Sequence, residues 1–202
     1  MNFFKSLFFS PITLFRFIRF FILVYNSRNR IVILVDIDNT IADSWHSLLL
    51  KNQWRSECQR VADLAVFLGM RNLLIDLDEL KEVKIIYYTA RSISSVRSTL
   101  NWLKGVGIFF SNSSLVVTRT PRTKILYLQW LFHRYKRIIY IDDLSHKHET
   151  GNTIFFVNEI ETLRKLENTR PNLKYLDVTT INKINLEYAK GAKKVADYLP
   201  LY

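Results

Sequence analysis

Short, continuous apolar runs rich in β-branched residues are the feature that most restricts what this chain can fold into. They are IVILVDI at 31–37, VKIIYYT at 83–89, LVVT at 115–118, RIIYID at 137–142 and TIFFV at 153–157. A strand without polar alternation is typical of a parallel sheet that helices cover on both faces. Segments with helical periodicity lie between the runs, at 92–104 and 122–135. The alternation predicts an α/β fold, a Rossmann-like three-layer arrangement around a parallel sheet with right-handed crossovers.

One segment does not follow this alternation. Residues 44–82, directly after the first run, are predicted to form two helices, 45–68 and 71–82, with Gly69 as the break between them. The segment would be a small helical cap inserted into the core.

The length of the chain limits how many domains it can form. A chain of 202 residues favours one domain with additional segments over two full domains. We therefore divide it into an N-terminal arm at 1–29, a core at 30–160 that contains the cap insertion, and a helical C-terminal extension at 161–202.

Composition excludes several classes of protein. Hydrophobic residues make up 49% of the chain, which excludes disorder over most of its length. The single cysteine, Cys58, excludes a disulfide scaffold and a cysteine-based zinc site, and it fits a reducing compartment. The net charge is +11, but residues 1–30 hold five basic residues and no acid. The remaining bias is mild, so no specific nucleic-acid partner is expected.

The N-terminal arm is very apolar and carries one narrow basic face. In a helix, Lys5, Arg16 and Arg19 would project from the same side, with Phe, Leu and Ile around the rest. This pattern favours an amphipathic helix at 1–25 that lies in the headgroup region of a membrane. A helix docked on the protein's own core and a true membrane span are the alternatives. The expected location is cytoplasmic, peripherally associated with the inner face of the membrane.

Polar side chains follow the predicted strands at the points where they end. They are Asp36, Asp38, Thr89, Lys124, Asp142 and Asp143. Because ligand-binding residues gather at the carboxyl ends of parallel strands, these side chains are expected to converge on one edge of the sheet. Four carboxylates in one place would repel one another unless a cation neutralised them. Oxygen ligands are those that Mg²⁺ prefers, which predicts a magnesium site.

The order of these residues resembles the haloacid dehalogenase superfamily of phosphotransferases. VDIDNTIADS at 35–44 is similar to the first motif of that family, an Asp-x-Asp-x-Thr after an apolar strand. Thr89 is similar to the second motif, Lys124 to the third, and Asp142 with Asp143 to the acidic fourth. The resemblance covers roughly residues 31–157 and keeps the order, spacing and strand context of all four motifs.

The resemblance implies a role for each matching residue. Asp36 would attack phosphorus, and Asp38 would be the general acid and base. The residues implied in binding the substrate phosphate are Thr89, Ala90, Arg91 and Lys124. For Arg91, a solvated position at the start of a helix is an equal alternative.

The resemblance also implies a cofactor. Mg²⁺ would be held by the Asp36 carboxylate, the backbone carbonyl of Asp38, and one member of the pair Asp142 and Asp143. The sequence leaves open which member of the pair is the ligand. His146 and His148 follow closely, either as solvated residues or with a role toward metal or leaving group.

The implied function is hydrolysis of a phosphomonoester through a phospho-aspartate intermediate, with Mg²⁺ as cofactor, at a membrane surface. The expected partners are a phosphorylated substrate and, through residues 1–25, the membrane. Two alternatives remain: a nucleotide or polynucleotide-end phosphatase, and a catalytically inactive membrane-bound binding module with the same fold.

Overall fold

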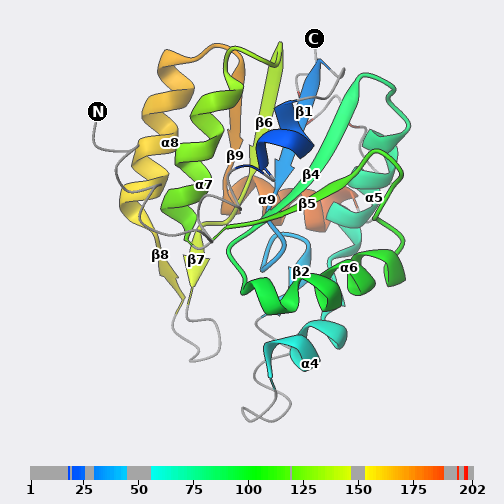
Figure 1. Cartoon of the computed structure of the whole chain (residues 1–202). Coiled ribbons are helices and arrows are strands. Elements are labelled where there is room, and N and C mark those ends of the chain that lie inside the picture. Colours follow the sequence, from blue (N-terminus) through cyan, green and yellow to red (C-terminus); the bar gives the residue numbers. More distant parts are fainter. Residues whose placement is uncertain are drawn as a thin grey trace.

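Five parallel strands form the central sheet (Figure 1). Their order across the sheet is β5–β4–β1–β6–β9. They are β1 (Ile31–Val35), β4 (Val83–Thr89), β5 (Ser114–Val117), β6 (Arg137–Ile141) and β9 (Leu173–Leu176). The computed structural model describes residues 18, 20–25, 30–44, 56–118, 120–146, 153–188, 195, 198 and 199.

Helices cover both faces of this sheet, so the molecule has the three layers expected of a Rossmann-like α/β fold (Figure 1). One face carries α5 (Leu68–Asp78), α6 (Val96–Gly105) and α9 (Val178–Glu187). The other carries α7 (Pro121–Leu128), α8 (Val157–Thr169) and the short helical turn η1 (Phe21–Tyr25). Single turns η2 (Ile93–Ser95) and η3 (Gln129–Leu131) adjoin α6 and α7.

The buried strand β1 explains why its sequence has no polar alternation. Ile31, Ile33 and Val35 belong to the core beneath one helical layer, and Val32 and Leu34 belong to the core beneath the other. Because successive side chains of a strand point to opposite faces, a strand covered on both sides must be apolar throughout. The prediction of a sheet with two buried faces is confirmed.

The strand order reverses beside β1. From β1 the chain passes outward through β4 to β5, then crosses to β6 on the other side of β1 and continues to β9. Val35 of β1 and Ile141 of β6 are paired in register. The residues that follow these two strands are therefore neighbours at the reversal, which is where open α/β sheets bind ligands.

The apolar run at 153–157 does not join the central sheet, contrary to expectation. Within it, β8 (Ile154–Phe155) pairs antiparallel with β7 (Ser145–His146), and both residues of β8 are exposed. The fifth strand is instead β9, within the segment predicted to be a helical extension. A short apolar run fits an exposed ribbon as well as a buried strand, so hydrophobicity alone cannot distinguish them.

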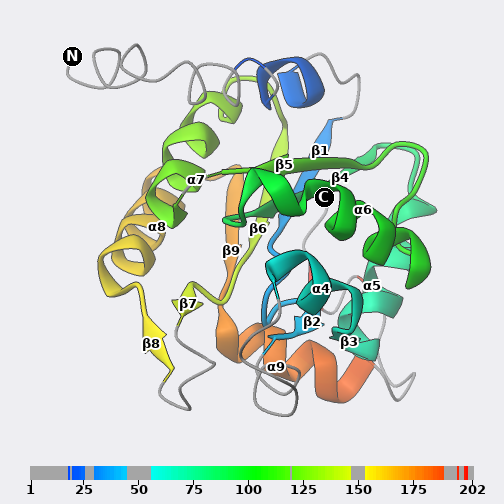
Figure 2. The same ribbon diagram turned by 60° about the horizontal axis from the view of Figure 1, so that its bottom comes forward.

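The segment predicted as the cap insertion also differs from expectation. The helix α4 (Glu57–Ala62) ends well before residue 68, and β3 (Ala65–Val66) follows it and pairs with β2 (Ala42–Asp43). Figure 2 shows α4 beside these two short strands. Residues 45–55 lie outside the described part of the chain.

Gly69 lies inside α5 and does not separate two helices. A Cβ atom at this position would approach Asn185 Cα and Ile184 O of α9 to 2.5 Å each. Glycine is therefore required here by the close packing of two helices. The buried side chains of α5 belong to the main core, so α5 is a core helix.

The described part of the N-terminal arm packs on the sheet. Phe20 and Val24 are buried, and the centroid of the Phe20 ring lies 5.0 Å from the centroid of the Tyr127 ring. Tyr135 donates a hydrogen bond to the Val24 carbonyl. Ile18, Phe21 and Ile22 are exposed.

The predicted basic face of the arm, at Lys5, Arg16 and Arg19, lies outside the described residues. Among the residues that the structure describes, no helix is long and apolar enough to cross a membrane. One side of the described part of the arm therefore packs on the core. Contact of the arm with a membrane stays a prediction.

Candidate active site

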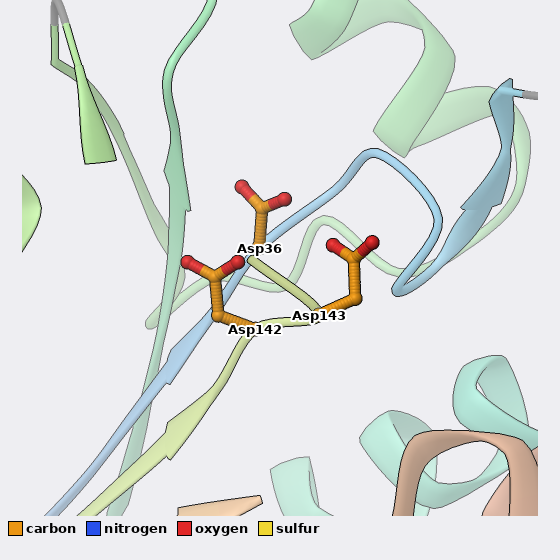
Figure 3. Close-up of side chains that lie close together, drawn as sticks. All are labelled: Asp36, Asp142 and Asp143. Carbon is orange, nitrogen blue, oxygen red and sulfur yellow. The ribbon is translucent and has the colours of Figure 1, made fainter. Parts of the chain in front are cut away.

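Three buried carboxylates meet where the strand order reverses. Asp36 directly follows β1, and its backbone N–H donates to the Ile141 carbonyl of β6 at 2.8 Å. Asp142 and Asp143 directly follow β6. One oxygen of each carboxylate lies within 4.8 Å of the others, and all three side chains point to the same side (Figure 3).

Lys124 joins this carboxylate cluster from α7. The Thr120 hydroxyl caps the helix by accepting from the Thr123 N–H, and Pro121 occupies the first turn, where its missing N–H is tolerated. Lys124 on that turn is buried, and its Nζ donates to Asp36 Oδ1 at 2.5 Å and to Asp142 Oδ2 at 2.8 Å. One ammonium group therefore links the ends of β1 and β6.

Tyrosines hold Asp142 and Lys124 in place. The Tyr140 hydroxyl donates to Asp142 Oδ2 at 2.7 Å, and the Tyr175 hydroxyl donates to the Asp142 carbonyl at 3.1 Å. The Tyr88 hydroxyl donates to the Lys124 carbonyl at 2.9 Å. These side chains were not predicted as part of the site. Tyr140 and Tyr88 lie on apolar strands, where the sequence shows no difference between a tyrosine that packs and one that positions a ligand.

The cluster has fewer positive than negative groups. Burial raises the pKa of Asp36 to about 7 against the opposing charge of Lys124, and the negative charge of Asp142 adds to the rise. Burial and the charges of Asp142 and Asp36 also raise the pKa of Asp143 well above its usual range. Burial lowers the pKa of Lys124, but the two carboxylates outweigh it and the pKa is raised.

A divalent cation fits this donor set. Three carboxylates face one ammonium, so ionising all of them leaves an excess negative charge that a cation would offset. From the described residues, Asp36 Oδ2 and Asp143 Oδ1 accept no hydrogen bond, and so each keeps a free oxygen. Oxygen ligation by carboxylates suits hard cations such as Mg²⁺ and Ca²⁺.

Asp38 lies outside the carboxylate cluster and pairs with Arg91. Arg91 Nε donates to Asp38 Oδ2 at 2.8 Å and its Nη2 to Oδ1 at 2.6 Å, while Nη1 donates to the Thr99 hydroxyl at 3.1 Å. The Ser44 hydroxyl donates to Asp38 Oδ1 at 2.6 Å. Burial raises the pKa of Asp38, but the charge and hydrogen bonds of Arg91 outweigh it and lower the pKa to about 2.

A tight turn after Asp38 brings Ser44 back to it. Asn39 has a left-handed backbone, with φ 53°, and its N–H donates to the Ala42 carbonyl at 2.8 Å. Asparagine tolerates this conformation better than most residues. The turn leads into β2, so the position of Asp38 depends on the strands that border the insertion.

The residues implied in phosphate binding have different surroundings. The Thr89 hydroxyl is buried and finds no hydrogen-bond partner among the described residues. Arg91 is buried, which contradicts the solvated alternative, and its guanidinium is occupied by Asp38 and Thr99. Ala90 and Lys124 both line the pocket described next.

A pocket of about 590 Å³ opens over this edge of the sheet. It is lined by Asp36, Asp38, Ala90, Thr120, Pro121, Arg122, Lys124, Asp142, Leu144, Ser145, His146, Phe156 and Glu159. The cavity therefore reaches from the carboxylate cluster toward β7 and the start of α8. His148 lies outside the described residues.

Comparisons of the chain with protein-family models, curated proteins and solved structures found no match. The case for a function therefore depends on the geometry and charge of this site.

Proposed function

We propose that the protein is a Mg²⁺-dependent phosphomonoester hydrolase in which Asp36 is the nucleophile. The observation that carries the proposal is the contact of Lys124 with Asp36 and Asp142, beside Asp143, at the edge of a pocket. A buried ammonium next to a carboxylate suits a site that receives a phosphoryl group, because it offsets the charge that nucleophile and substrate bring together.

Asp36 and Asp38 divide the reaction between them. In the first step an Asp36 oxygen attacks phosphorus, the bond from phosphorus to the alcohol oxygen breaks, and Asp38 gives that oxygen a proton. In the second step water attacks the phosphorus of phospho-Asp36 and loses a proton to Asp38, while the bond from phosphorus to the Asp36 oxygen breaks and frees the carboxylate. The products are the alcohol and inorganic phosphate, and both carboxyl groups return to their starting state.

The ion pair with Arg91 sets a condition on the first step. Asp38 is ionised while Arg91 holds both of its oxygens, since its pKa is about 2. It can accept a proton in this arrangement, but it must gain one before it can donate. Substrate binding therefore has to loosen the contacts of Asp38 with Arg91 or with Ser44.

Mg²⁺ would be held by Asp36, Asp142 and Asp143, and it would supply positive charge to the phosphoryl oxygens. Lys124 orients Asp36 through a hydrogen bond to Oδ1, which leaves Oδ2 with no hydrogen bond from the described residues. The buried Thr89 hydroxyl, which has no partner among the described residues, would be a further hydrogen-bond donor to the phosphate.

The test is release of inorganic phosphate by the purified full-length protein from a panel of phosphomonoesters. We expect turnover with Mg²⁺, none with EDTA, and a loss of at least about 1000-fold in Asp36→Asn. Asp78→Asn on α5 is the matched control and should keep full activity. If Asp36→Asn protein turns over normally, the mechanism is wrong. If no ester is hydrolysed, the inactive binding module is the better interpretation.

We also propose that the N-terminal arm holds the protein at a membrane surface. Val24 of η1 and Phe20 just before it pack on the core, while Ile18, Phe21 and Ile22 leave apolar surface exposed. Apolar surface next to a basic segment is typical of helices that lie in a lipid headgroup layer.

Sedimentation with anionic and neutral vesicles tests this attachment. Full-length protein should bind anionic vesicles and release with salt. Ile22→Ser should weaken binding, whereas Leu186→Ser, at an equally exposed position on α9, should not. Equal effects of the two substitutions, or no binding of the intact chain, would remove the membrane from the proposal.

A further inference from the structure

The pocket has a second wall that the proposed chemistry does not use. The rings of His146 and Phe156 stack there, with centroids 4.3 Å apart and planes inclined by 28°. Both side chains line the same cavity as Asp36 and Lys124. His146 lies on β7, and Phe156 directly precedes α8. We call this stacked pair the platform.

The backbone ties the platform to the carboxylate cluster. Leu144 follows Asp143 in a left-handed conformation, with φ 48°, and its N–H donates to Asp142 Oδ1 at 2.9 Å. The Leu144 carbonyl accepts from the Phe156 N–H at 2.8 Å. One residue thus connects a candidate metal ligand to the platform, which fixes the distance between the reacting edge and the rings.

Polar groups line the same pocket as the platform. Among the described residues, none forms an ion pair or a side-chain hydrogen bond with Arg122 or Glu159, which line the pocket beside it. The Nδ1 atom of His146 is buried and has no hydrogen-bond partner there. An exposed donor, a half-buried acceptor and a buried ring nitrogen, none with a side-chain partner among the described residues, therefore line one cavity. Of the three, the His146 nitrogen is the buried atom that would normally have a partner.

We propose that this wall is the subsite for the leaving alcohol, and that the alcohol carries a ring with a hydrogen-bonding edge. The inference rests on the proposed function and adds the class of ester. The face of such a ring would pack on the platform, and its edge would receive bonds from Arg122 and give bonds to Glu159. Sugars and nucleobases share this chemistry. An unbranched alkyl chain would offer these groups no hydrogen-bonding edge.

The experiment compares esters with and without a ring. Wild-type protein should show higher kcat/KM on hexose phosphates or nucleoside monophosphates than on glycerol phosphate and an unbranched alkyl phosphate. Phe156→Leu keeps an apolar side chain but removes the ring face, and should lower kcat/KM on the preferred ring ester roughly tenfold through KM, as the loss of a stacked ring predicts. The ring-free esters should lose less than about twofold.

Phe155→Leu is the matched control, because Phe155 is the adjacent residue, is also a phenylalanine and does not line the pocket. It should leave both classes of ester unchanged. If Phe156→Leu affects both classes equally, or if the wild type prefers the alkyl phosphate, the subsite is wrong. In that case Mg²⁺-dependent turnover of ring-free esters would still support the proposed function.

Glu159→Gln tests the hydrogen-bonding edge of the substrate ring, independently of the stacking that Phe156→Leu tests. It should weaken the preferred ring ester about tenfold, since a carboxylate that accepts from a ring donor is replaced by an amide. Whether this loss appears with hexose phosphates or with nucleoside monophosphates shows whether the bound ring is a sugar or a nucleobase. Calorimetric binding of the same esters to Asp36→Asn protein repeats the comparison without turnover. Equal affinity of Asp36→Asn and Asp36→Asn/Glu159→Gln for every ring ester would overturn the proposal.

Discussion

Asp36 and Asp38 are two residues apart in the chain, yet their surroundings give them opposite properties. Asp36 is buried at the end of β1 among other carboxylates, and its pKa rises to about 7. Asp38 lies past the strand, receives two hydrogen bonds from Arg91, and its pKa falls to about 2. The difference in pKa has two causes. Asp36 is more deeply buried than Asp38. In addition, one ammonium serves three carboxylates in the first group, whereas one guanidinium serves a single carboxylate in the second.

This comparison assigns different needs to the two groups. The cluster around Asp36 is short of positive charge and would gain from a metal ion. The pair of Asp38 and Arg91 is balanced without one. The ion pair nevertheless has to loosen before Asp38 can act as an acid. The carboxylate cluster needs only to bind a metal ion.

The largest expected effect comes from Lys124→Met. Removing the ammonium leaves Asp36 and Asp142 buried without their partner, which should cost about 3–5 kcal/mol of unfolding free energy at neutral pH. Chemical denaturation measures the loss. Lys165→Met, an exposed residue on α8, is the control and should change stability little. A Lys124→Met protein as stable as the wild type would mean that the cluster is not short of positive charge.

The second prediction contrasts Asp36→Asn with Asp38→Asn in Mg²⁺-free protein. A carboxyl with a raised folded-state pKa loses stabilising effect as the pH rises from its unfolded value of 3.8 to about 7. Asp36→Asn should therefore raise the unfolding free energy at about pH 8, by up to about 4 kcal/mol. Removing a carboxylate with a lowered pKa should instead decrease the unfolding free energy at this pH. Asp38→Asn should cost only about 1 kcal/mol, because its side chain is 37% exposed and water screens the pair.

Denaturant titrations with EDTA at about pH 5 and about pH 8 measure both signs, and the gap between the variants should widen at the higher pH. If both substitutions change the unfolding free energy in the same direction at about pH 8, the contrast between Asp36 and Asp38 is wrong.

Bound Mg²⁺ should offset the shortage of positive charge in the carboxylate cluster and so stabilise the folded protein. A ligand that binds the folded protein adds about 3 kcal/mol at a hundredfold excess over its Kd. Because protons compete with Mg²⁺ for Asp36 and Asp143, the rise in Tm should be larger at about pH 8 than at about pH 5. Calorimetry with Mg²⁺ and with EDTA checks this. Asp143→Asn should lose most of the rise, and Asp78→Asn should keep it.

The fourth prediction concerns the clamp on Asp38. Arg91→Lys removes the paired hydrogen bonds and the contact with Thr99, and should cost about 1–2 kcal/mol at neutral pH. The cost should shrink as the pH falls from about 4 toward 2, since Asp38 begins to take up a proton over this range and the ion pair weakens. Urea titrations over that range test the trend against Arg97→Ala, an exposed control on α6. A cost that does not vary with pH would show that Arg91 acts by packing alone.

The smallest effect is expected for Ser44→Ala. Its hydroxyl gives Asp38 one further hydrogen bond, at 2.6 Å in a partly exposed position. Loss of the bond should change stability by less than about 1 kcal/mol. The pH dependence of kcat is the more sensitive readout, because a weaker hold on Asp38 favours its protonated form. An unchanged acidic limb would separate Ser44 from the function of Asp38.

Several features of the protein could be predicted from the sequence alone. The apolar runs at 31–37 and 137–142 predicted β1 and β6 because both faces of the sheet are buried, so no polar residue interrupts these strands. The parallel direction of the strands placed Asp36 and Asp142 at the same edge of the sheet. That β1 and β6 are neighbours there is known only from the structure. These predictions needed only local hydrophobicity and the direction of the strands.

The edges of the fold were decided by tertiary structure. The edge strand β9 includes Lys174, whose side chain reaches Glu167 of α8, and this polar residue hid the strand from a search for apolar runs. Gly69 suggested the end of a helix, and only the backbone of Asn185 explains why glycine is needed there. Such contacts join residues that no local pattern relates.

The same distinction separates the two acids of the first motif. The position of Asp36 followed from its strand, but the partner of Asp38 is 53 residues away in the chain. Sequence alone allowed Arg91 to be solvated or to meet substrate, and folding buried it against Asp38. An apolar strand determines its own burial, whereas the partner of a charge depends on which distant side chain the fold brings within hydrogen-bonding distance.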